Sequence, residues 1–423
     1  MNKPLAVVSC PIDTYSGYGA RARDFVKALI NTDKYEVSIL SQRWGNTRFG
    51  YLNDHNETDL ENRIIDKLTA KPDIWFQITV PNEFQPVGKY NIGVTAGMET
   101  TLVHPTWLEG CNRMDLVLTS SEHSKHTFVN SAFEKKDTKT DKVLKKFKLE
   151  KPMEVLLEGV DTTKYFTTKS SFDLSSIEEE FSFLFVGHWL PGNLGHDRKN
   201  VGLLIKSFLE TFKNKLKQPA LILKTSITGS SIMDQEFLTK KIDKIRSTVK
   251  GKLPNIYLLH GDLSDEEINL LYNSSKVKAM ISLTKGEGFG RPLLEFTMTG
   301  KPVIASGWSG QIDFLKQDSS VLIGGELETV DNSAVVKDMI LADAKWFKPS
   351  EQEISKAYKE VYKHYKKYVT LGKKQKHFSK TNFAFENMQT ILAAQLDKYV
   401  PDFPKKVELT MPKLNLPKLQ TNG

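Results

Sequence analysis

The chain is poor in cysteine and has no long apolar segment. Its 423 residues include only two cysteines, Cys10 and Cys111, too few for a disulfide framework or a structural zinc site, so we expect both to be small packing residues. No apolar run approaches the ~20 residues that a membrane-spanning helix needs. Residues 1–10 are a polar start that runs into an apolar strand, without the organisation of a secretory signal. These absences predict a cytoplasmic protein.

Composition permits a folded protein with an anionic partner. Apolar residues make up 39% of the chain, which is long enough for about two or three domains with cores of their own. The net charge of +8 favours an anion, but nucleotide sugars, lipid phosphates, acidic membranes and DNA are all anionic. Lysines concentrate in residues 134–151 and again in 356–376. We interpret these segments as a solvated loop and a solvated helix face, and leave open a contact with an acceptor's phosphates or with the anionic inner face of a membrane.

Apolar runs and helical segments alternate along the chain in two series, which favours parallel sheets covered by helices. The first series, 1–170, ends where the chain becomes polar and rich in serine and threonine, between Asp161 and Glu180. The second series occupies 171–380. We therefore predict an α/β protein with two doubly wound halves. The expected strands are Leu5–Ser9, Tyr35–Leu40, Asp73–Ile78, Asn91–Thr95, Leu116–Thr119, Glu154–Leu157, Phe181–Gly187, Ala220–Lys224, Ile256–Leu259, Ala279–Ser282, Pro302–Ala305 and Ser320–Ile323.

The segment 285–305 predicts an anion site at the end of a strand. It follows an apolar run, 277–283, that is typical of a buried strand, and it leads into a helix over 293–300 that a glycine ends. Between them, Gly288 and Gly290 let backbone N–H groups approach a ligand closely. The start of the helix adds a partial positive charge that suits a phosphate.

Two carboxylates flank this turn. Glu287 would be repelled by a phosphate but can accept hydrogen bonds from hydroxyl groups. Glu295, further along, can do the same for a ribose. A phosphate site next to two hydroxyl-binding carboxylates predicts a nucleotide sugar that lies across the loop.

The spacing of these acids resembles the Glu-x7-Glu signature of the retaining GT-B glycosyltransferases, in particular the large family 4. Further segments fall in the family's order, namely Gly286–Gly290, Pro292–Glu295, Gly300–Ile304 and Ser309–Gly310. The resemblance implies two Rossmann-like domains around a central cleft, with 1–170 on the acceptor side and 171–380 binding the nucleotide sugar. It also implies that 381–400 form a helix that returns to the first domain. Prolines at short intervals in 401–423 predict an irregular tail.

Positive side chains are expected where the donor's phosphates lie. Arg198 and Lys199 stand at the start of an amphipathic helix, in a segment that resembles the Arg-Lys-Asn stretch of these transferases, whose lysine contacts the donor diphosphate. Many members have an arginine after the preceding strand's glycine, where this chain has His188. Either His188 donates in its place, or Arg198 or Lys224 takes over that role. Fixed cations at this point stabilise a leaving phosphate without reorganisation.

The first domain is expected to hold the acceptor and cover the donor. Gly17 and Gly19 resemble the glycine loop that approaches the donor in GT-B enzymes, although the motif alone is equally typical of a tight turn. Many relatives place a histidine against the donor sugar, in a position that Gly97 occupies here. Glu99 is therefore the expected polar contact, and His104 is a poorer one.

The resulting candidate site combines both domains. Its expected catalytic residues are Glu99, Lys199 and Glu287. Its expected donor-binding residues are Gly17, Gly19, His188, Arg198, Lys199, Lys224, Leu263, Glu287, Gly288, Phe289, Gly290 and Glu295, where Leu263 marks the backbone that recognises the base in relatives. No Asp-x-Asp motif ends a strand, so no metal is implied, and the nucleotide-diphosphate sugar is a donor substrate rather than a cofactor. The resemblance implies retention by a front-face route, in which the departing phosphate helps to deprotonate the acceptor.

Three functions fit these residues. The first is transfer of a sugar to a glycan or a lipid-linked acceptor. The second is glycosylation of DNA bases in a host cytoplasm, because the chain is basic and residues 188–208 resemble virus-encoded members of the family; against it, the sequence has no aromatic array for stacking bases and no nucleic-acid motif. The third is a nonenzymatic module that binds a nucleotide sugar or a glycan on the same fold. The presence of both acids and Lys199 disfavours this third function.

Overall fold

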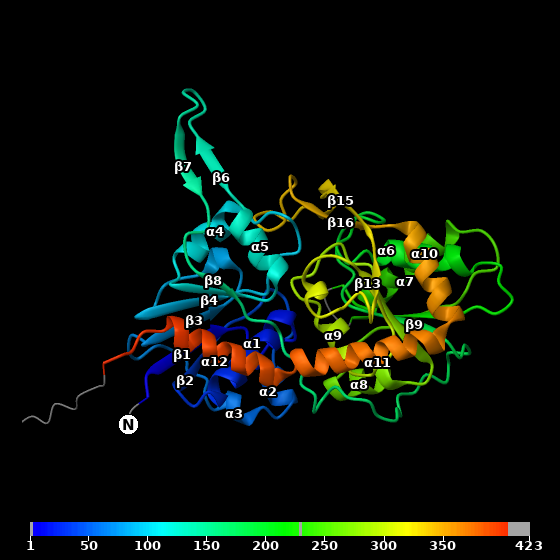
Figure 1. The fold of residues 1–423 in the computed structure, drawn as a ribbon, viewed down its shortest axis with the longest axis horizontal. Coiled ribbons are helices and arrows are strands. Elements are labelled where there is room, and N and C mark those ends of the chain that lie inside the picture. The colour runs from blue at the N-terminus through cyan, green and yellow to red at the C-terminus, as the bar shows by residue number, and fades with distance from the viewer. Residues whose placement is uncertain (1–2, 228–230, 405–423) are drawn as a thin grey trace, which may run out of the picture.

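The computed structural model describes residues 3–227 and 231–404 and contains two parallel sheets packed with helices (Figure 1). Each sheet has six strands, which confirms the predicted α/β class with two doubly wound halves. The predicted irregular tail, 401–423, lies outside the described residues from 405 onward. The exact domain limits stay predictions.

The first sheet has the strand order β2-β1-β3-β4-β5-β8, with parallel neighbours throughout. Its strands are β1 (Leu5–Cys10), β2 (Glu36–Ser41), β3 (Ile74–Ile78), β4 (Tyr90–Val94), β5 (Leu116–Thr119) and β8 (Met153–Val155). The helices of this half are α1 (Gly17–Asn31), α2 (Tyr51–Asp54), α3 (Thr58–Glu61), α4 (Pro105–Asn112) and α5 (Glu122–Asn130), with a short turn η1 (Pro81–Glu83). Strand β3 is buried along its whole length, as expected for an inner strand of a parallel sheet covered on both faces.

The second sheet has the order β11-β10-β9-β12-β13-β14, again with parallel neighbours. Its strands are β9 (Ser182–Val186), β10 (Ala220–Lys224), β11 (Ile256–Leu259), β12 (Val277–Ser282), β13 (Val303–Ser306) and β14 (Val321–Ile323). The elements around it are α6 (Val201–Phe212), α7 (Ile232–Ser247), α8 (Asp265–Asn273), α9 (Arg291–Thr297), η2 (Gly310–Asp313) and η3 (Asn332–Ala334). At the carboxyl edge of this sheet, His188 lies just after β9, Lys224 ends β10, and the glycine-rich turn follows β12.

Both cysteines lie in the interior of the first half. Cys10 ends β1, Cys111 lies in α4, and both are fully buried free thiols. Burial raises the pKa of both thiols. They therefore stay protonated and pack as small apolar groups.

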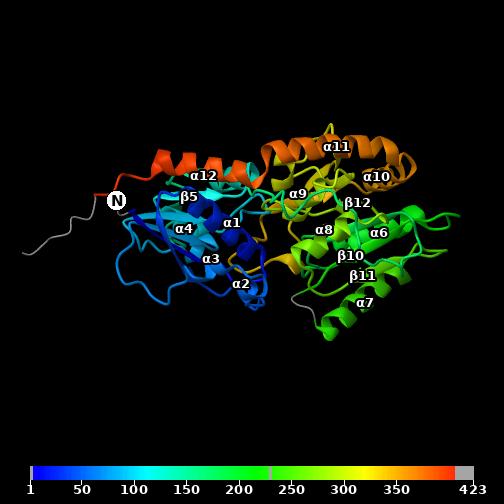
Figure 2. The same ribbon diagram turned by 90° about the horizontal axis from the view of Figure 1, so that it is seen from below.

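Three helices lead the chain from the second half back to the first (Figure 2). They are α10 (Glu351–Lys363), α11 (Tyr365–Asn382) and α12 (Phe385–Tyr399). Met388, Leu392 and Leu396 recur at helical spacing on α12 and are buried in the core of the first half, where α12 packs against α1. The helices α10 to α12 therefore connect the two halves, because the last of them packs in the core of the first half.

The lysine-rich segment that we predicted to be a solvated loop is a β-hairpin, so that prediction was wrong in its structure. Strands β6 (Phe133–Lys136) and β7 (Val143–Phe147) pair antiparallel. The hairpin gives no alternation of apolar and polar residues because neither of its faces is covered. Such a strand pair cannot be recognised from hydrophobic patterning.

A second antiparallel pair, β15 (Gly325–Thr329) and β16 (Lys345–Pro349), was also not predicted. We call residues 325–349 the arm. Trp346 of the arm is fully buried and packs with Leu102 of the first half and Trp308 of the second. The arm therefore links the two halves on a side separate from the α11–α12 crossing (Figure 1).

Candidate active site

A glycine-rich turn joins β12 to α9 and lies directly against the first half. A Cβ atom on Gly286 would lie 1.9 Å from the carbonyl oxygen of Glu99, and one on Gly288 would lie 2.1 Å from that of Ala96. Ser120 Oγ donates to the carbonyl oxygen of Gly288 at 2.9 Å. Glycine is therefore required at both positions, because the backbones of the two halves meet here.

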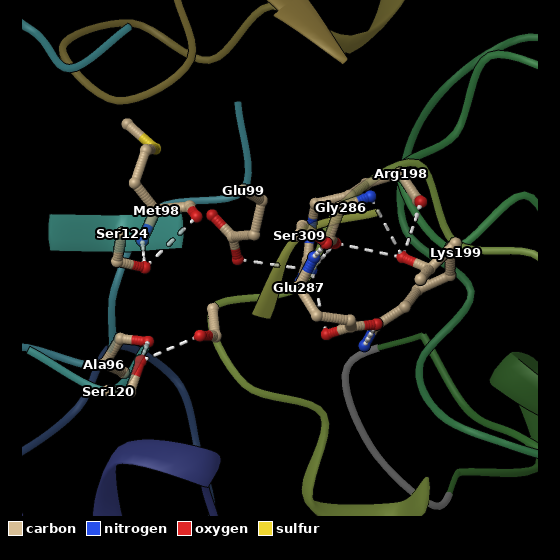
Figure 3. Close-up of polar contacts among 12 residues, drawn as sticks. Ala96, Met98, Glu99, Ser120, Ser124, Arg198, Lys199, Gly286, Glu287 and Ser309 are labelled. Carbon is tan, nitrogen blue, oxygen red and sulfur yellow. Dashed lines mark hydrogen bonds and ion pairs between the residues drawn. The ribbon is translucent and has the colours of Figure 1, made fainter. Parts of the chain in front are cut away.

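Glu287 is held in this turn through its backbone. Its N–H donates to Ser309 Oγ at 2.9 Å, and its carbonyl oxygen accepts from the N–H of Gly310 at 3.0 Å. Ser309 has a φ of 70°, which is uncommon for a residue other than glycine and typical of functional loops. The side chain of Glu287 is thereby directed toward Arg198 and Lys199 (Figure 3).

Two cations and two carboxylates meet at this turn (Figure 3). Lys199 Nζ lies 2.5 Å from Oε1 of Glu287. Arg198 Nη1 lies 3.4 Å from Oε2 of Glu287 and 3.2 Å from Oε1 of Glu99. It also donates to the carbonyl oxygen of Gly286 at 3.0 Å. The structure thus brings the three predicted catalytic residues together, with Glu99 from the first half and Lys199 and Glu287 from the second.

The local backbone fixes both cations before α6 begins. Asn200 adopts a left-handed conformation with φ 56°, and Asp197 Oδ1 accepts from the N–H of Val201, the first residue of α6, at 3.2 Å. The carbonyl oxygen of Arg198 accepts from the N–H of Lys285 at 2.8 Å. This last bond ties the cation loop to the glycine-rich turn, so the two segments are positioned together.

Burial and charge oppose each other in this cluster. Loss of solvent alone would raise the pKa of the Glu287 carboxyl, but the charges of Lys199 and Arg198 outweigh burial and hold that pKa below its ordinary value. Burial lowers the pKa of Lys199, against the opposing charge of Glu287. A buried pair offsets its desolvation only while both partners are present. Arg198 and Lys199 are therefore fixed hydrogen-bond donors. An anionic ligand would compete with Glu287 for them.

A cavity of about 690 Å³ opens between the two halves. Gly17 and Trp44 line it from the first half and His188 from the second. Arg48 Nη1 and Asp262 Oδ2 lie 3.8 Å apart, so this pair connects the two halves at the cavity. Two of the predicted donor contacts, Gly17 and His188, thus share one interdomain cavity.

His188 stands where many family members have an arginine, and its properties differ from those of that arginine. Its Nδ1 lies 3.2 Å from Ser226 Oγ. Partial burial is the main cause that lowers the pKa of His188. The positive charges of Lys199, Lys224 and Arg198 lower this pKa further. A neutral imidazole can donate one hydrogen bond to a phosphate but brings no charge. Lys224 Nζ is itself engaged with the carbonyl oxygen of Gly261 at 2.5 Å.

Three other predicted donor contacts, Gly19, Phe289 and Leu263, pack against the protein itself. A Cβ atom on Gly19 would lie 2.3 Å from the carbonyl oxygen of Thr14, so this glycine serves packing at the start of α1. The ring of Phe289 is buried against Phe314, which leaves only its backbone for a ligand. Leu263 is partly buried against a hydrophobic cluster of the second half. Their roles toward a donor stay predictions.

Glu295 lies in different surroundings from Glu287. It lines a smaller cavity of about 140 Å³ between the halves, together with Asp265 and Arg291. Arg291 Nε lies 3.6 Å from Glu295 Oε1, while its Nη1 lies 2.6 Å from Asp24 and 3.1 Å from Glu158, both of the first half. Burial raises the pKa of Glu295 to about 7. Glu295 is therefore part of an interdomain ion network.

The arm contacts all three segments that carry the clustered residues. Thr101, close to Glu99, exchanges two hydrogen bonds of 2.9 Å with the backbone of Lys345. The N–H of Asn193, in the loop before Arg198, donates to Ser333 Oγ at 3.0 Å. Lys285, just before the glycine-rich turn, is only 1% exposed, and its ammonium group pairs with Glu328. The arm is therefore a common support for the site.

Sequence reasoning missed Arg291, Lys285 and Glu328. Arg291 directly follows the last glycine of the turn, but nothing in the sequence indicates its partners on the first half. Lys285 begins the motif segment, while Glu328 lies in a hairpin that the sequence does not reveal. A charged residue beside a glycine-rich turn was the only available signal.

Neither a metal centre nor a membrane span is found in the described ranges. Within residues 3–227 and 231–404, no group of three or more His, Cys, Asp or Glu side chains is arranged to hold a metal ion. No helix of this part of the chain is long and apolar enough to cross a membrane.

Known proteins share this architecture and part of this sequence. Residues 181–332, which include Arg198, Lys199, Glu287 and Glu295, match the family described as Glycosyl transferases group 1. No curated protein sequence matches the chain.

Solved structures match both halves together. Sucrose-phosphate synthase from Thermosynechococcus elongatus superposes with a TM-score of 0.63 at 12% identity, over 94% of this chain and 99% of that one. Anabaena HepE in complex with UDP-glucose superposes with a TM-score of 0.62 at 13% identity, over 93% of this chain and 100% of that one. A glycosyltransferase from Rickettsia africae gives 0.58 at 12% identity, over 95% and 100%.

The two parallel halves and their interdomain cluster define the GT-B fold of glycosyltransferases. Residues 181–332 carry a domain of the family described as Glycosyl transferases group 1. Nothing in these similarities supports a virus-encoded branch.

Proposed function

We propose that this protein is a retaining, metal-independent glycosyltransferase that moves a sugar from a nucleotide-diphosphate donor to a glycan or a lipid-linked acceptor. The observation that carries the proposal is the buried cluster of Arg198, Lys199, Glu287 and Glu99 on a fixed turn between the halves. Anabaena HepE, which shares the fold, binds UDP-glucose, and this motivates a uracil nucleotide as the first donor to test.

The cations supply the charge that the leaving group needs. As the bond between the sugar and the diphosphate breaks, negative charge grows on the departing phosphate oxygen, and preorganised donors stabilise it most when they need not move. Lys199 and Arg198 are held by the glycine-rich turn and by α6. The diphosphate takes the place of Glu287 as their partner. Helix α9 has only seven residues and a proline near its start, so we assign most of the phosphate charge to these side chains.

The carboxylate of Glu287 is then free to bind the donor sugar. Once Lys199 binds the diphosphate, Glu287 accepts hydrogen bonds from hydroxyl groups of the donor sugar, and Glu99 contacts the sugar from the first half. Both acids are thereby assigned to the sugar's hydroxyl groups, which leaves neither of them to act as a nucleophile. We therefore propose a front-face reaction with retention, in which the departing phosphate oxygen takes the proton of the acceptor hydroxyl.

Thermal unfolding of the full chain with a set of nucleotide sugars, in the presence of a chelator, tests this function. A donor at ~100 times its dissociation constant adds about 2.7 kcal/mol to the free energy of unfolding. We expect UDP-sugars or another nucleotide sugar to raise the melting temperature without added metal. Stabilisation by none of them, or only after magnesium or manganese is added, would contradict the proposal.

A further inference from the structure

The hairpin β6–β7 stands away from the body of the protein (Figure 1). The side chains of residues 134–136 and 138–146 are exposed, so neither face of the hairpin is covered. Only its base joins the core, through Phe133 and Phe147. A two-stranded sheet with no covered face is marginally stable by itself. The projecting part thus adds little to the core, which makes it a candidate contact surface.

The hairpin and the four residues that follow it carry a large share of the positive charge. Residues 133–151 contain eight lysines and four acidic residues, a net charge of +4 out of the chain's +8. The acids are largely engaged within the hairpin: Asp137 accepts from the backbone N–H groups of the turn, while Glu134 and Asp141 pair with neighbouring lysines. The surplus charge therefore lies on lysines.

Five of these lysines have no ion pair within the described ranges, namely Lys135, Lys139, Lys142, Lys148 and Lys151. Lys135 also stands opposite Lys145 in the strand register, but the ammonium group of Lys145 already pairs with Glu109 of α4, so the surplus charge lies on the unpaired lysines. The arrangement favours an anionic partner.

An exposed apolar residue lies among these lysines. Leu144 is 57% exposed, and Val143 beside it is 36% exposed. Leu144 is the extra residue of a bulge, because the register passes from the Lys135–Lys145 pair to the Lys136–Val143 pair. Lysines on an exposed strand can serve merely to prevent pairing with another sheet. That explanation leaves the exposed leucine without a role, whereas cations beside an apolar side chain suit the boundary between lipid headgroups and acyl chains.

We propose that the β6–β7 hairpin is a docking surface for an anionic phospholipid membrane, with its lysines at the headgroup phosphates and Leu144 at the acyl boundary. The contact would be peripheral. It does not depend on the donor chemistry proposed above, and it would bring a lipid-linked acceptor close to the first half of the enzyme.

Vesicle sedimentation of the full chain tests the proposal. The probes are vesicles of phosphatidylcholine alone and of phosphatidylcholine with equimolar phosphatidylglycerol. The test variants are K135Q/K139Q/K142Q/K148Q and L144S. The matched control, K356Q/K359Q/K363Q/K366Q, removes the same charge from exposed positions on α10 and α11. Binding of each protein to duplex DNA is measured in parallel, and melting curves show that all variants are folded.

We expect binding to the anionic vesicles that weakens as salt rises from about 0.1 M to about 1 M, where the screening length falls from ~10 Å to ~3 Å. Each lysine near the surface contributes roughly fivefold, so the hairpin lysine variant should lose at least ~100-fold in partition coefficient, and the control much less. L144S should lose roughly tenfold on vesicles and nothing on DNA. Equal losses in the hairpin and control variants, an unchanged L144S, or lysine-dependent binding to DNA but not to vesicles would each overturn the proposal.

Discussion

The two acids of the Glu-x7-Glu signature lie in different surroundings, although one stands in the glycine-rich turn and the other in the short helix α9 that follows it. Glu287 pairs with Lys199 in the interdomain cluster. Glu295 shares a separate small cavity with Arg291, whose other partners lie on the first half. If Glu287 meets the sugar and Glu295 the ribose, substitutions should separate their effects.

Glu287→Gln should reduce sugar transfer without weakening the binding of the free nucleoside diphosphate, because the sugar contact lies beyond the phosphates and the carboxylate that competes for Lys199 is neutralised. Glu295→Ala should weaken the binding of donor and free nucleotide alike, by about 1–3 kcal/mol for a hydrogen-bonded charged group. Turnover assays and calorimetric titrations measure both quantities. Negligible effects from both substitutions in folded protein would remove the pair from the site.

The raised pKa of Glu295 predicts a pH dependence of stability. Burial is its main cause, with Arg291 opposing it. Because the folded protein holds this proton more tightly than the unfolded chain, the ionised carboxylate destabilises the fold, and this penalty grows as pH rises from 4.5 to about 7. Below that window Glu295 is protonated in both states and no penalty exists.

Urea denaturation of wild type and Glu295→Gln across this range measures the effect. The difference in unfolding free energy, variant minus wild type, should rise with pH by up to about 3 kcal/mol and become constant above the window. A difference that does not change with pH would show that Glu295 titrates as a solvated carboxyl does.

At the scale of elements, the sequence revealed the buried parallel strands and concealed the two antiparallel hairpins. The limits of β5 and β10 follow directly from apolar runs, because both strands are buried inside a parallel sheet. The hairpins β6–β7 and β15–β16 have no such signal. The partners of Arg291 were hidden for a related reason, since Asp24 and Glu158 lie on distant elements that only the tertiary structure brings together.

The arm offers a prediction at this scale. Glu328→Gln leaves the ammonium group of Lys285 buried without its carboxylate, and should cost about 1–3 kcal/mol of stability in addition to lowering turnover through the turn that Lys285 precedes. Glu326→Gln is the matched control, because Glu326 is 75% exposed and pairs only with Lys348 at 3.6 Å, an interaction worth less than about 1 kcal/mol. Denaturation and turnover assays distinguish the two variants. Equal effects of the two substitutions on stability and turnover would show that the buried Lys285–Glu328 pair contributes no more than an exposed ion pair does.

For the whole molecule, the motif segment predicted the fold class and much of the site, because glycines, acids and cations stand in a recognisable order along one chain. It could not predict how closely the halves meet. Gly286 and Gly288 are packed against backbone of the first half, so the cluster is complete only when the two halves are together.

Gly286→Ala tests this requirement. The added methyl group would lie 1.9 Å from the carbonyl oxygen of Glu99, which neither half can relieve without moving apart. We expect each half to stay folded, the radius of gyration from solution scattering to increase, and turnover to fall sharply. Wild-type turnover and wild-type dimensions in this variant would show that close contact of the halves is not needed.

The central claim is that Lys199, paired with Glu287 in the absence of a ligand, holds the donor diphosphate without metal. Calorimetric titration with UDP-glucose, or with the nucleotide sugar that stabilises the protein most, in the presence of a chelator tests it most directly. Wild type should bind, and Lys199→Ala should bind about 1.5–3 kcal/mol more weakly because a charge-assisted partner is lost. Lys206→Ala, on the helix α6 that follows Lys199, should bind as wild type does. Unchanged affinity in Lys199→Ala, or binding that appears only when metal is restored, would contradict the claim.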